Sequence, residues 1–456
     1  MITATSTSYP HIRTAVILLL TAAAATVAQA SPEIPGGKQE QPIALVGGTI
    51  HPVSSAPIEG ATILFDGGKI VAVGRDVSLP EGAQRVDLQG QHVYPGLIDA
   101  NSQLGLVEVP SIRGSRDQSE TGLINPNVRA EVAFNPDSEL IPVGRSGGVL
   151  AVLTAPSGGL IRGTSACMQL DGWTWEDMCL KGNIGLHVQW PRMQPIEAWW
   201  IEESQTQQTE NRDSALKTIR QALADARAYR QARKACADGK GPEPAHDARW
   251  ESMIGVLEGK TRVFIDADDI QQIQAALAFA QQEGLKAVIV GGYDAAECAA
   301  LLKKHEVPVI LGGVHRTPER PGDDYDAPFT LASRLRDAGI PFCIAGEIGG
   351  ASGSQPSNIR NLPYHAATAA AYGLPADEAL KAITLYPAQI LGVADRLGSL
   401  ESGKDATLIV TTGDPLEITT QVTAAYIQGR AVDLNDRHKR LWNKYKEKYR
   451  RLGIKN

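Results

Sequence analysis

Short runs of alternating apolar and polar residues mark both ends of the chain and are typical of half-buried β-strands. The Asp-Gly-Gly at 66–68 lies between two such runs and predicts a hairpin. Because an isolated hairpin is only marginally stable, we expect the two ends to form one composite β-sandwich domain from residues 43–92 and 395–435. The runs lie at 43–50, 61–65, 69–73, 85–88, 406–410, 422–427 and 429–432.

The middle of the chain has a different pattern, in which apolar runs of about five residues alternate with longer amphipathic segments. This regular strand–helix repeat is typical of a parallel sheet covered by helices. Over residues 93–394 it predicts an α/β fold, a (β/α)8 TIM-type barrel. The expected strands are 148–153, 262–265, 286–290, 307–311 and 341–345, and the expected helices are 215–234, 269–283, 294–305, 327–338, 362–372 and 376–385.

The first 30 residues have the layout of a secretory signal peptide. A polar leader ends at Arg13, an apolar run covers 15–27, and Ala-Gln-Ala at 28–30 is a small-x-small cleavage site. The apolar run is shorter than the about 20 residues that a membrane-spanning helix needs. We therefore expect cleavage after Ala30 and a periplasmic or secreted product.

Composition excludes some function classes. The 456-residue chain has a net charge of −7 and only 5% aromatic residues, so nucleic acid is not an expected partner. Basic residues gather at 436–456, which we predict to be a terminal helix, and the composition of 31–42 is typical of a linker.

No Cys-x-x-Cys occurs among the five cysteines. Cys167 and Cys179 are close enough in sequence to pair in an oxidising compartment, and buried free thiols are the equal alternative.

Three motifs stand in order along the predicted barrel. They are Val-Tyr-Pro-Gly-Leu-Ile-Asp-Ala at 93–100, Asn-Leu-Pro-Tyr-His-Ala-Ala-Thr at 361–368, and Ala-Ile-Thr-Leu-Tyr-Pro-Ala-Gln at 382–389, the last followed by Gly-Asp-Pro at 413–415. Together they resemble the amidohydrolase superfamily, close to its imidazolonepropionase-like and dihydroorotase-like members. The resemblance covers about residues 41–435.

The resemblance implies metal-assisted hydrolysis, in which one or two divalent ions such as Zn²⁺ activate a bound water. It implies His-x-His after the first barrel strand, a lysine or glutamate on a middle strand, one histidine on each of the next two strands and an aspartate on the last. At the His-x-His position this chain has Asn101-Ser102-Gln103. Amides are not usual zinc ligands.

The other ligand positions also depart from the pattern. Asp266 stands where the next histidine is expected, and two glycines at 291–292 stand where the following one is expected. Glu347 replaces the final aspartate, and Lys260 is the nearest candidate for the lysine. The sequence therefore predicts no conventional metal site, and the cofactor stays unknown.

The chain offers other polar residues at expected strand ends, where barrel sites form. Asp266, His315 and Glu347 are the candidate catalytic residues, because two carboxylates and an imidazole suit either a harder ion such as Mg²⁺ or Ca²⁺ or metal-free acid–base chemistry. Asn101, Gln103 and Arg162 are candidate substrate-binding residues. Arg162 lies in a glycine-rich stretch at 155–165, which is interpreted as an anion-cradling or a structural loop. The tryptophan-rich stretch at 187–200 is interpreted as a ligand-lining lid, a subunit contact or part of the packed core.

Two functions remain open from sequence. One is a hydrolase of non-peptide or dipeptide-like C–N bonds, of the cyclic amide type, that uses a degenerate or noncanonical site. The other is a catalytically inactive periplasmic pseudoenzyme that serves as a binding protein or partner subunit. Both imply a small-molecule ligand or substrate, and a homo-oligomer or a hetero-oligomer with an active paralogue is compatible with either.

Overall fold

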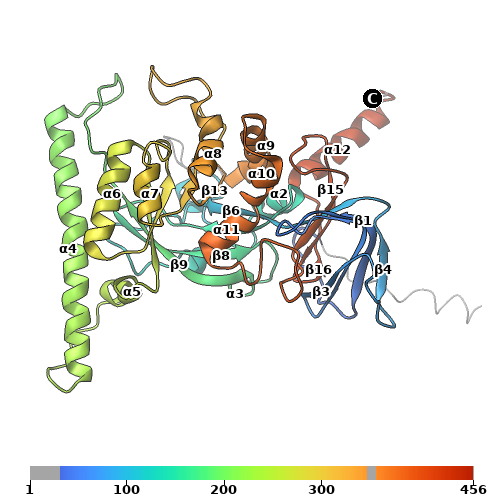
Figure 1. Cartoon of the computed structure of the whole chain (residues 1–456), viewed down its shortest axis with the longest axis horizontal. Coiled ribbons are helices and arrows are strands. Elements are labelled where there is room, and N and C mark those ends of the chain that lie inside the picture. Colours follow the sequence, from blue (N-terminus) through green and yellow to red (C-terminus); the bar gives the residue numbers. More distant parts are fainter. Residues whose placement is uncertain (1–30, 347–355, 455–456) are drawn as a thin grey trace, which may run out of the picture.

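The computed structural model describes residues 31–346 and 356–454, and the expected signal peptide lies outside the described residues. Two eight-stranded sheets dominate the molecule. Figure 1 shows a sheet domain on one side, a helix-covered barrel in the centre and the long helix α4 at the far edge of the barrel.

The sheet domain joins the two ends of the chain. Strand β5 pairs in parallel with β1 and antiparallel with β14, so that N-terminal and C-terminal strands form one sheet. Apolar side chains of both halves, among them Phe65 and Leu408, share one core. The strands are β1 (Ile43–Ile50), β2 (Ile58–Asp66), β3 (Lys69–Gly74), β4 (Gln84–Asp87), β5 (His92–Pro95), β14 (Leu408–Thr411), β15 (Val422–Ile427) and β16 (Arg430–Ala431).

The second sheet curls into a nearly closed barrel, as the sequence predicted. One strand breaks the expected rule, because β8 runs antiparallel to both of its neighbours while the other adjacent strands pair in parallel. The strands in order are β6 (Leu97–Ser102), β7 (Val149–Thr154), β8 (Ile161–Gln169), β9 (Cys179–Gln189), β10 (Arg262–Ala267), β11 (Ala287–Gly291), β12 (Val309–Leu311) and β13 (Phe342–Ile344).

The interior of the barrel is packed with side chains. Ile98, Phe264, Val288 and Cys343 belong to one buried cluster inside the strands. A Cβ at Gly185 of β9 would lie 2.1 Å from the Phe264 ring, so a glycine is required there for the ring to cross the barrel. The interior of the barrel is therefore filled by side chains, and the sites of such barrels form at the carboxyl ends of the strands.

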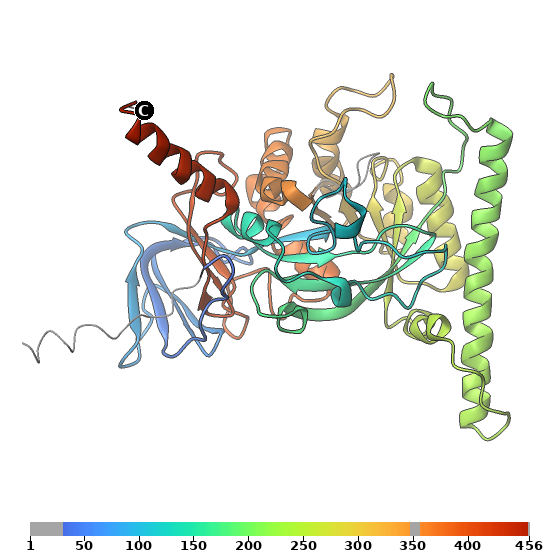
Figure 2. The ribbon, with the colours of Figure 1, turned by 180° about the vertical axis from the view of Figure 1, so that it is seen from behind.

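The helices cover the outside of the barrel or continue beyond it (Figures 1 and 2). They are α2 (Leu140–Ser146), α3 (Trp175–Met178), α4 (Gln205–Ala237), α5 (Ala248–Leu257), α6 (Ile270–Glu283), α7 (Ala299–Lys304), α8 (Ala327–Ala338), α9 (Leu362–Ala371), α10 (Ala376–Lys381), α11 (Leu385–Leu391) and α12 (Arg437–Arg451), with 3-10 turns at Arg113–Ser115, Ala130–Ala133 and Pro356–Asn361.

The prediction of one helix over 376–385 was wrong, because the helical backbone is interrupted between the end of α10 and the start of α11. The carbonyl of Ala382 accepts a hydrogen bond from Ile344 N, and that of Ile383 accepts one from Ile98 N, each at 2.9 Å. These carbonyls thus bridge β13 and β6, where the barrel would otherwise stay open. Tertiary hydrogen bonds outweigh the local helix propensity here.

Candidate functional site

The mouth of the barrel lies at the carboxyl ends of its parallel strands. Asn101 at the end of β6 and Gln103 just after it are both half-buried there. Beneath them the carboxylate of Asp99 accepts hydrogen bonds from Asn101 N at 3.3 Å and Gly346 N at 3.0 Å. Burial raises the pKa of Asp99 to about 6, in spite of these hydrogen bonds.

Arg162 of β8 and Asp266 of β10 form an ion pair across the mouth. Arg162 Nη1 donates to Asp266 Oδ2, and Nη2 donates to Gln189 Oε1 of β9. The Nε of Arg162 is buried and has no hydrogen-bond partner among the described residues. Burial raises the pKa of Asp266, against the opposing effect of the Arg162 guanidinium.

The position of Arg162 corrects the interpretation of 155–165 as a glycine-rich loop. Strand β8 begins at Ile161, so the guanidinium is carried by a strand rather than by a flexible turn. Because β8 is antiparallel to β9, its first residues stand at the same end of the barrel as the last residues of β9 and β10. This reversal brings Arg162 to the carboxylate of Asp266.

His187 is a buried residue of the mouth that the sequence did not single out. It pairs in register with Phe264 of β10 on one side and Gly163 of β8 on the other, two residues before Gln189. Its ring stacks on Phe264, and its Nε2 atom has no partner among the described residues. Burial, together with the charge of Arg162, lowers the pKa of His187 to about 3, so the ring is neutral at physiological pH.

The donor set does not fit a zinc ion. No group of three or more His, Cys, Asp or Glu that could hold a metal occurs within residues 31–346 and 356–454. Asp266 is engaged by Arg162, and Glu347 lies outside the described residues. Lys260 was the wrong candidate for a lysine ligand, because it precedes β10 at the opposite strand end and pairs with Glu258 at 2.7 Å.

His315 lies in the exposed loop after β12, as expected from the sequence. Its Nε2 is 2.8 Å from Thr368 Oγ1, and its ring centroid is 4.3 Å from that of His365 on α9. Among the described residues, no hydrogen bond or ion pair joins His315 to Asp266. A shared role of Asp266, His315 and Glu347 therefore stays a prediction.

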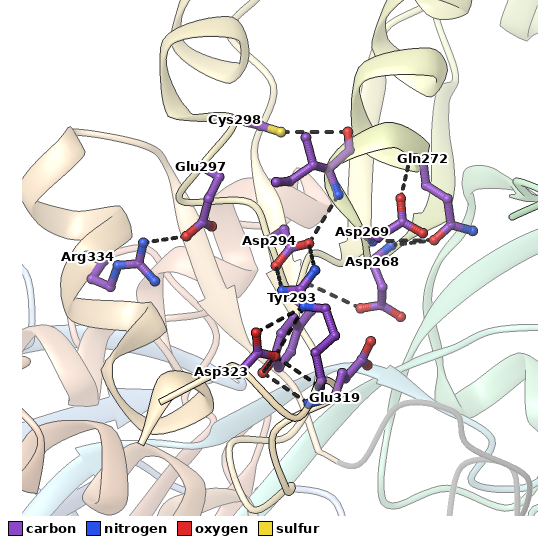
Figure 3. Close-up of polar contacts among 12 residues, drawn as sticks. Asp268, Asp269, Gln272, Tyr293, Asp294, Glu297, Cys298, Glu319, Asp323 and Arg334 are labelled. Carbon is purple, nitrogen blue, oxygen red and sulfur yellow. Dashed lines mark hydrogen bonds and ion pairs between the residues drawn. The ribbon is translucent and has the colours of Figure 1, made fainter. Parts of the chain in front are cut away.

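A second polar network fastens the loops beside the mouth (Figure 3). Arg320, in the loop between β12 and α8, donates to both carboxylate oxygens of Asp294, which follows β11. It also pairs with Asp323 at 3.0 Å, and the hydroxyl of Tyr293 donates to Asp323 at 2.8 Å. The carboxylate of Asp294 is almost fully buried. This network holds the loop at 312–326 against the β11 end.

The tryptophan-rich stretch does not cover the mouth as one lid. Trp190 is buried in the core, with its ring 5.0 Å from that of Phe279 on α6. Trp199 and Trp200 are 93% and 65% exposed.

All five cysteines are free, which decides between the two alternatives for Cys167 and Cys179 in favour of free thiols.

Comparison with known proteins agrees with this architecture. The family model of the Amidohydrolase family matches residues 298–434. The amidohydrolase tasK of Hapsidospora irregularis is 23% identical over 81% of the chain, which spans only 39% of that relative's length. The imidazolonepropionase of Erwinia tasmaniensis is 26% identical, with 77% of the chain and 86% of the relative aligned.

A solved structure extends the likeness to most of the chain. The crystal structure of an amidohydrolase from Thermotoga maritima superposes with a TM-score of 0.75 at 25% identity and covers 86% of this chain and 99% of its own. The barrel with its attached sheet domain and the sequence matches all point to the same superfamily. The chain belongs to the amidohydrolase superfamily of hydrolases.

Proposed function

We propose that this chain binds a small amide- or carboxylate-bearing molecule at the barrel mouth and does not perform metal-assisted hydrolysis. The observation that carries the proposal is the ion pair between Arg162 and Asp266. Asp266 stands where the superfamily pattern has a histidine ligand, and a guanidinium already neutralises it. A divalent ion would have to displace that guanidinium from a largely buried carboxylate, which is costly.

The same residues suit the recognition of a small polar molecule. The buried Nε of Arg162 is a donor in need of an acceptor, and a buried polar atom without a partner costs free energy. The neutral ring of His187 offers a second buried nitrogen, which can accept or donate according to its tautomer. An amide presents a carbonyl and an N–H side by side and could satisfy both groups. Asn101 and Gln103 would line the rim.

A ligand screen with product analysis tests this proposal. Cyclic amides and N-acyl amino acids are screened by thermal shift, and each hit is incubated with the protein and followed by NMR. We expect a hit that is recovered unchanged and is lost in Arg162→Gln. Arg249→Gln, which removes an exposed pair with Asp247 on α5, is the matched control and should keep binding. Turnover of the hit, abolished by Asp266→Asn, would overturn the proposal.

Noncanonical hydrolysis of a cyclic amide or dipeptide-like C–N bond is the second candidate. It is favoured by Asp99, because a buried carboxyl with a pKa of about 6 is suited to proton transfer near neutral pH. Asp266, His315 and Glu347 would then be the catalytic residues. The NMR incubation separates the two candidates, since only this one predicts product, and Asp99→Asn should abolish it.

The setting of the protein is part of the proposal. The signal-peptide layout of residues 1–30 supports export to the periplasm or medium, with cleavage after Ala30. A binding barrel of this kind would act alone, as a homo-oligomer or as the partner subunit of an active paralogue. N-terminal sequencing of the protein from its native host tests the cleavage, and sedimentation tests the assembly.

A further inference from the structure

Helix α12 projects from the body at the sheet-domain side and carries the C-terminus outward (Figures 1 and 2). Its first turn is fixed, because the Asp436 side chain accepts from Lys439 N at 2.8 Å and Arg440 pairs with Glu33 and Glu139 at 2.9 and 2.8 Å. Beyond that turn the helix has no buried residue. The helix is therefore anchored at one end and uncovered along its length.

One face of α12 is apolar and aromatic. Leu441, Tyr445, Tyr449 and Leu452 recur at spacings of three and four residues, which places them on one side of a helix, and Trp442 extends this stripe. All five are exposed, Trp442 to 60%. A stripe of this kind on a stable helix normally packs against a partner, since exposed apolar surface is unfavourable in water.

The remaining faces of α12 are strongly basic. The helix carries eight Lys or Arg and one acid, Glu447, although the whole chain has 44 basic and 51 acidic residues. The ammonium of Lys446 lies 4.5 Å from the Trp442 ring centroid, and those of Lys444 and Lys448 each lie 5.9 Å from the Tyr445 ring. Cations thus border the aromatic stripe on an otherwise acidic molecule.

We propose that α12 is a membrane-surface anchor that binds a bilayer containing anionic lipids. An amphipathic helix with Trp and Tyr on one face and Lys and Arg on the others lies in the interface, where the rings enter the headgroup boundary and the cations contact phosphates. Charge complementarity selects an anionic surface, because α12 has eight basic residues and one acid on a chain whose acidic residues outnumber its basic ones. No helix of the described residues is long and apolar enough to span a membrane.

Vesicle co-sedimentation of the intact purified protein tests this inference. We expect binding to vesicles of phosphatidylcholine mixed with phosphatidylglycerol, weak binding to phosphatidylcholine alone, and release in concentrated salt. The triple variant Lys444→Gln, Lys446→Gln, Lys448→Gln should lower the partition coefficient about a hundredfold, because each basic residue near an anionic surface contributes about a fivefold factor. The variant Trp442→Ser should weaken binding without changing its salt dependence.

A matched control separates α12 from charge in general. Lys217→Gln, Arg220→Gln and Lys234→Gln remove three exposed cations from α4 on the opposite side of the molecule and should leave binding unchanged. Equal binding by the α12 variant and wild type would overturn the inference. So would a failure to bind anionic vesicles, or a dimer in sedimentation that dissociates when Trp442 is replaced, because a second copy would then be the occupant. None of these outcomes bears on the barrel mouth.

Discussion

Arg162 and Asp266 face each other from strands β8 and β10, on either side of β9, and their side chains meet at the mouth of the barrel. Only 13% and 22% of these two side chains are exposed. Asp266 stands where the resemblance to the superfamily predicts a histidine ligand, and we propose that the pair takes the place of a metal ion. The guanidinium of Arg162 thus neutralises the Asp266 carboxylate that a metal ion would need.

Replacing Arg162 by Gln should destabilise the fold, because Asp266 would keep a largely buried charge without a partner. We expect a loss of about 3 kcal/mol in the free energy of unfolding, measured by urea denaturation. The double variant Arg162→Gln, Asp266→Asn should recover about 2 kcal/mol of that loss. Arg249→Gln, at an exposed pair, should cost less than about 1 kcal/mol. Strictly additive effects of the two changes would argue against the ion pair.

The stability of the protein should fall in acid through His187. Its folded-state pKa of about 3 lies below the ordinary value of 6.5, so protonation favours the unfolded state as the pH drops. Between pH 6.5 and pH 4.5 this group alone should remove about 2 kcal/mol from the free energy of unfolding. His187→Gln should flatten the pH profile by that amount in denaturation at several pH values. Parallel profiles for variant and wild type would contradict the buried neutral ring.

The loop at 312–326 should loosen when Arg320 is replaced by Gln. The variant removes the guanidinium from both the buried Asp294 and Asp323, and Asp323 keeps the hydrogen bond from the Tyr293 hydroxyl. About half of Arg320 is exposed, which limits the effect, and we expect about tenfold faster amide hydrogen exchange in this loop. Arg334→Gln breaks an exposed pair with Glu297 and serves as control. Unchanged exchange in the loop would show that other contacts hold it.

The sequence located some of the candidate site because 262–265, with its apolar residues at 263–265, has a clear strand pattern. Asp266 follows that run directly, and parallel strands of a barrel all end at one mouth. The missing His-x-His was visible because Pro-Gly-Leu-Ile-Asp-Ala fixes the register of Asn101 and Gln103. Positions tied to a clear strand end were therefore accessible to sequence reasoning.

The rest of the site was hidden for physical reasons. Strand β9 places Gly185, His187 and Gln189 on one face and apolar residues on the other, so it lacks the continuous apolar run that marks the other barrel strands. Strand β8 runs against the others, and no local periodicity reports strand direction. The sequence therefore predicted Arg162 as a candidate substrate-binding residue but did not predict its pairing with Asp266. The break between α10 and α11 likewise depends on hydrogen bonds to distant strands.

The metal content of the purified, untagged protein after dialysis against a weak chelator tests the central claim most directly. A guanidinium that neutralises Asp266, beside amides at Asn101 and Gln103, predicts a folded protein without a stoichiometric divalent ion. Added Zn²⁺ should then leave the thermal unfolding temperature unchanged. Retention of close to one Zn²⁺ per chain, lost in Asp266→Asn, would contradict the account and return the protein to the metal-dependent hydrolases.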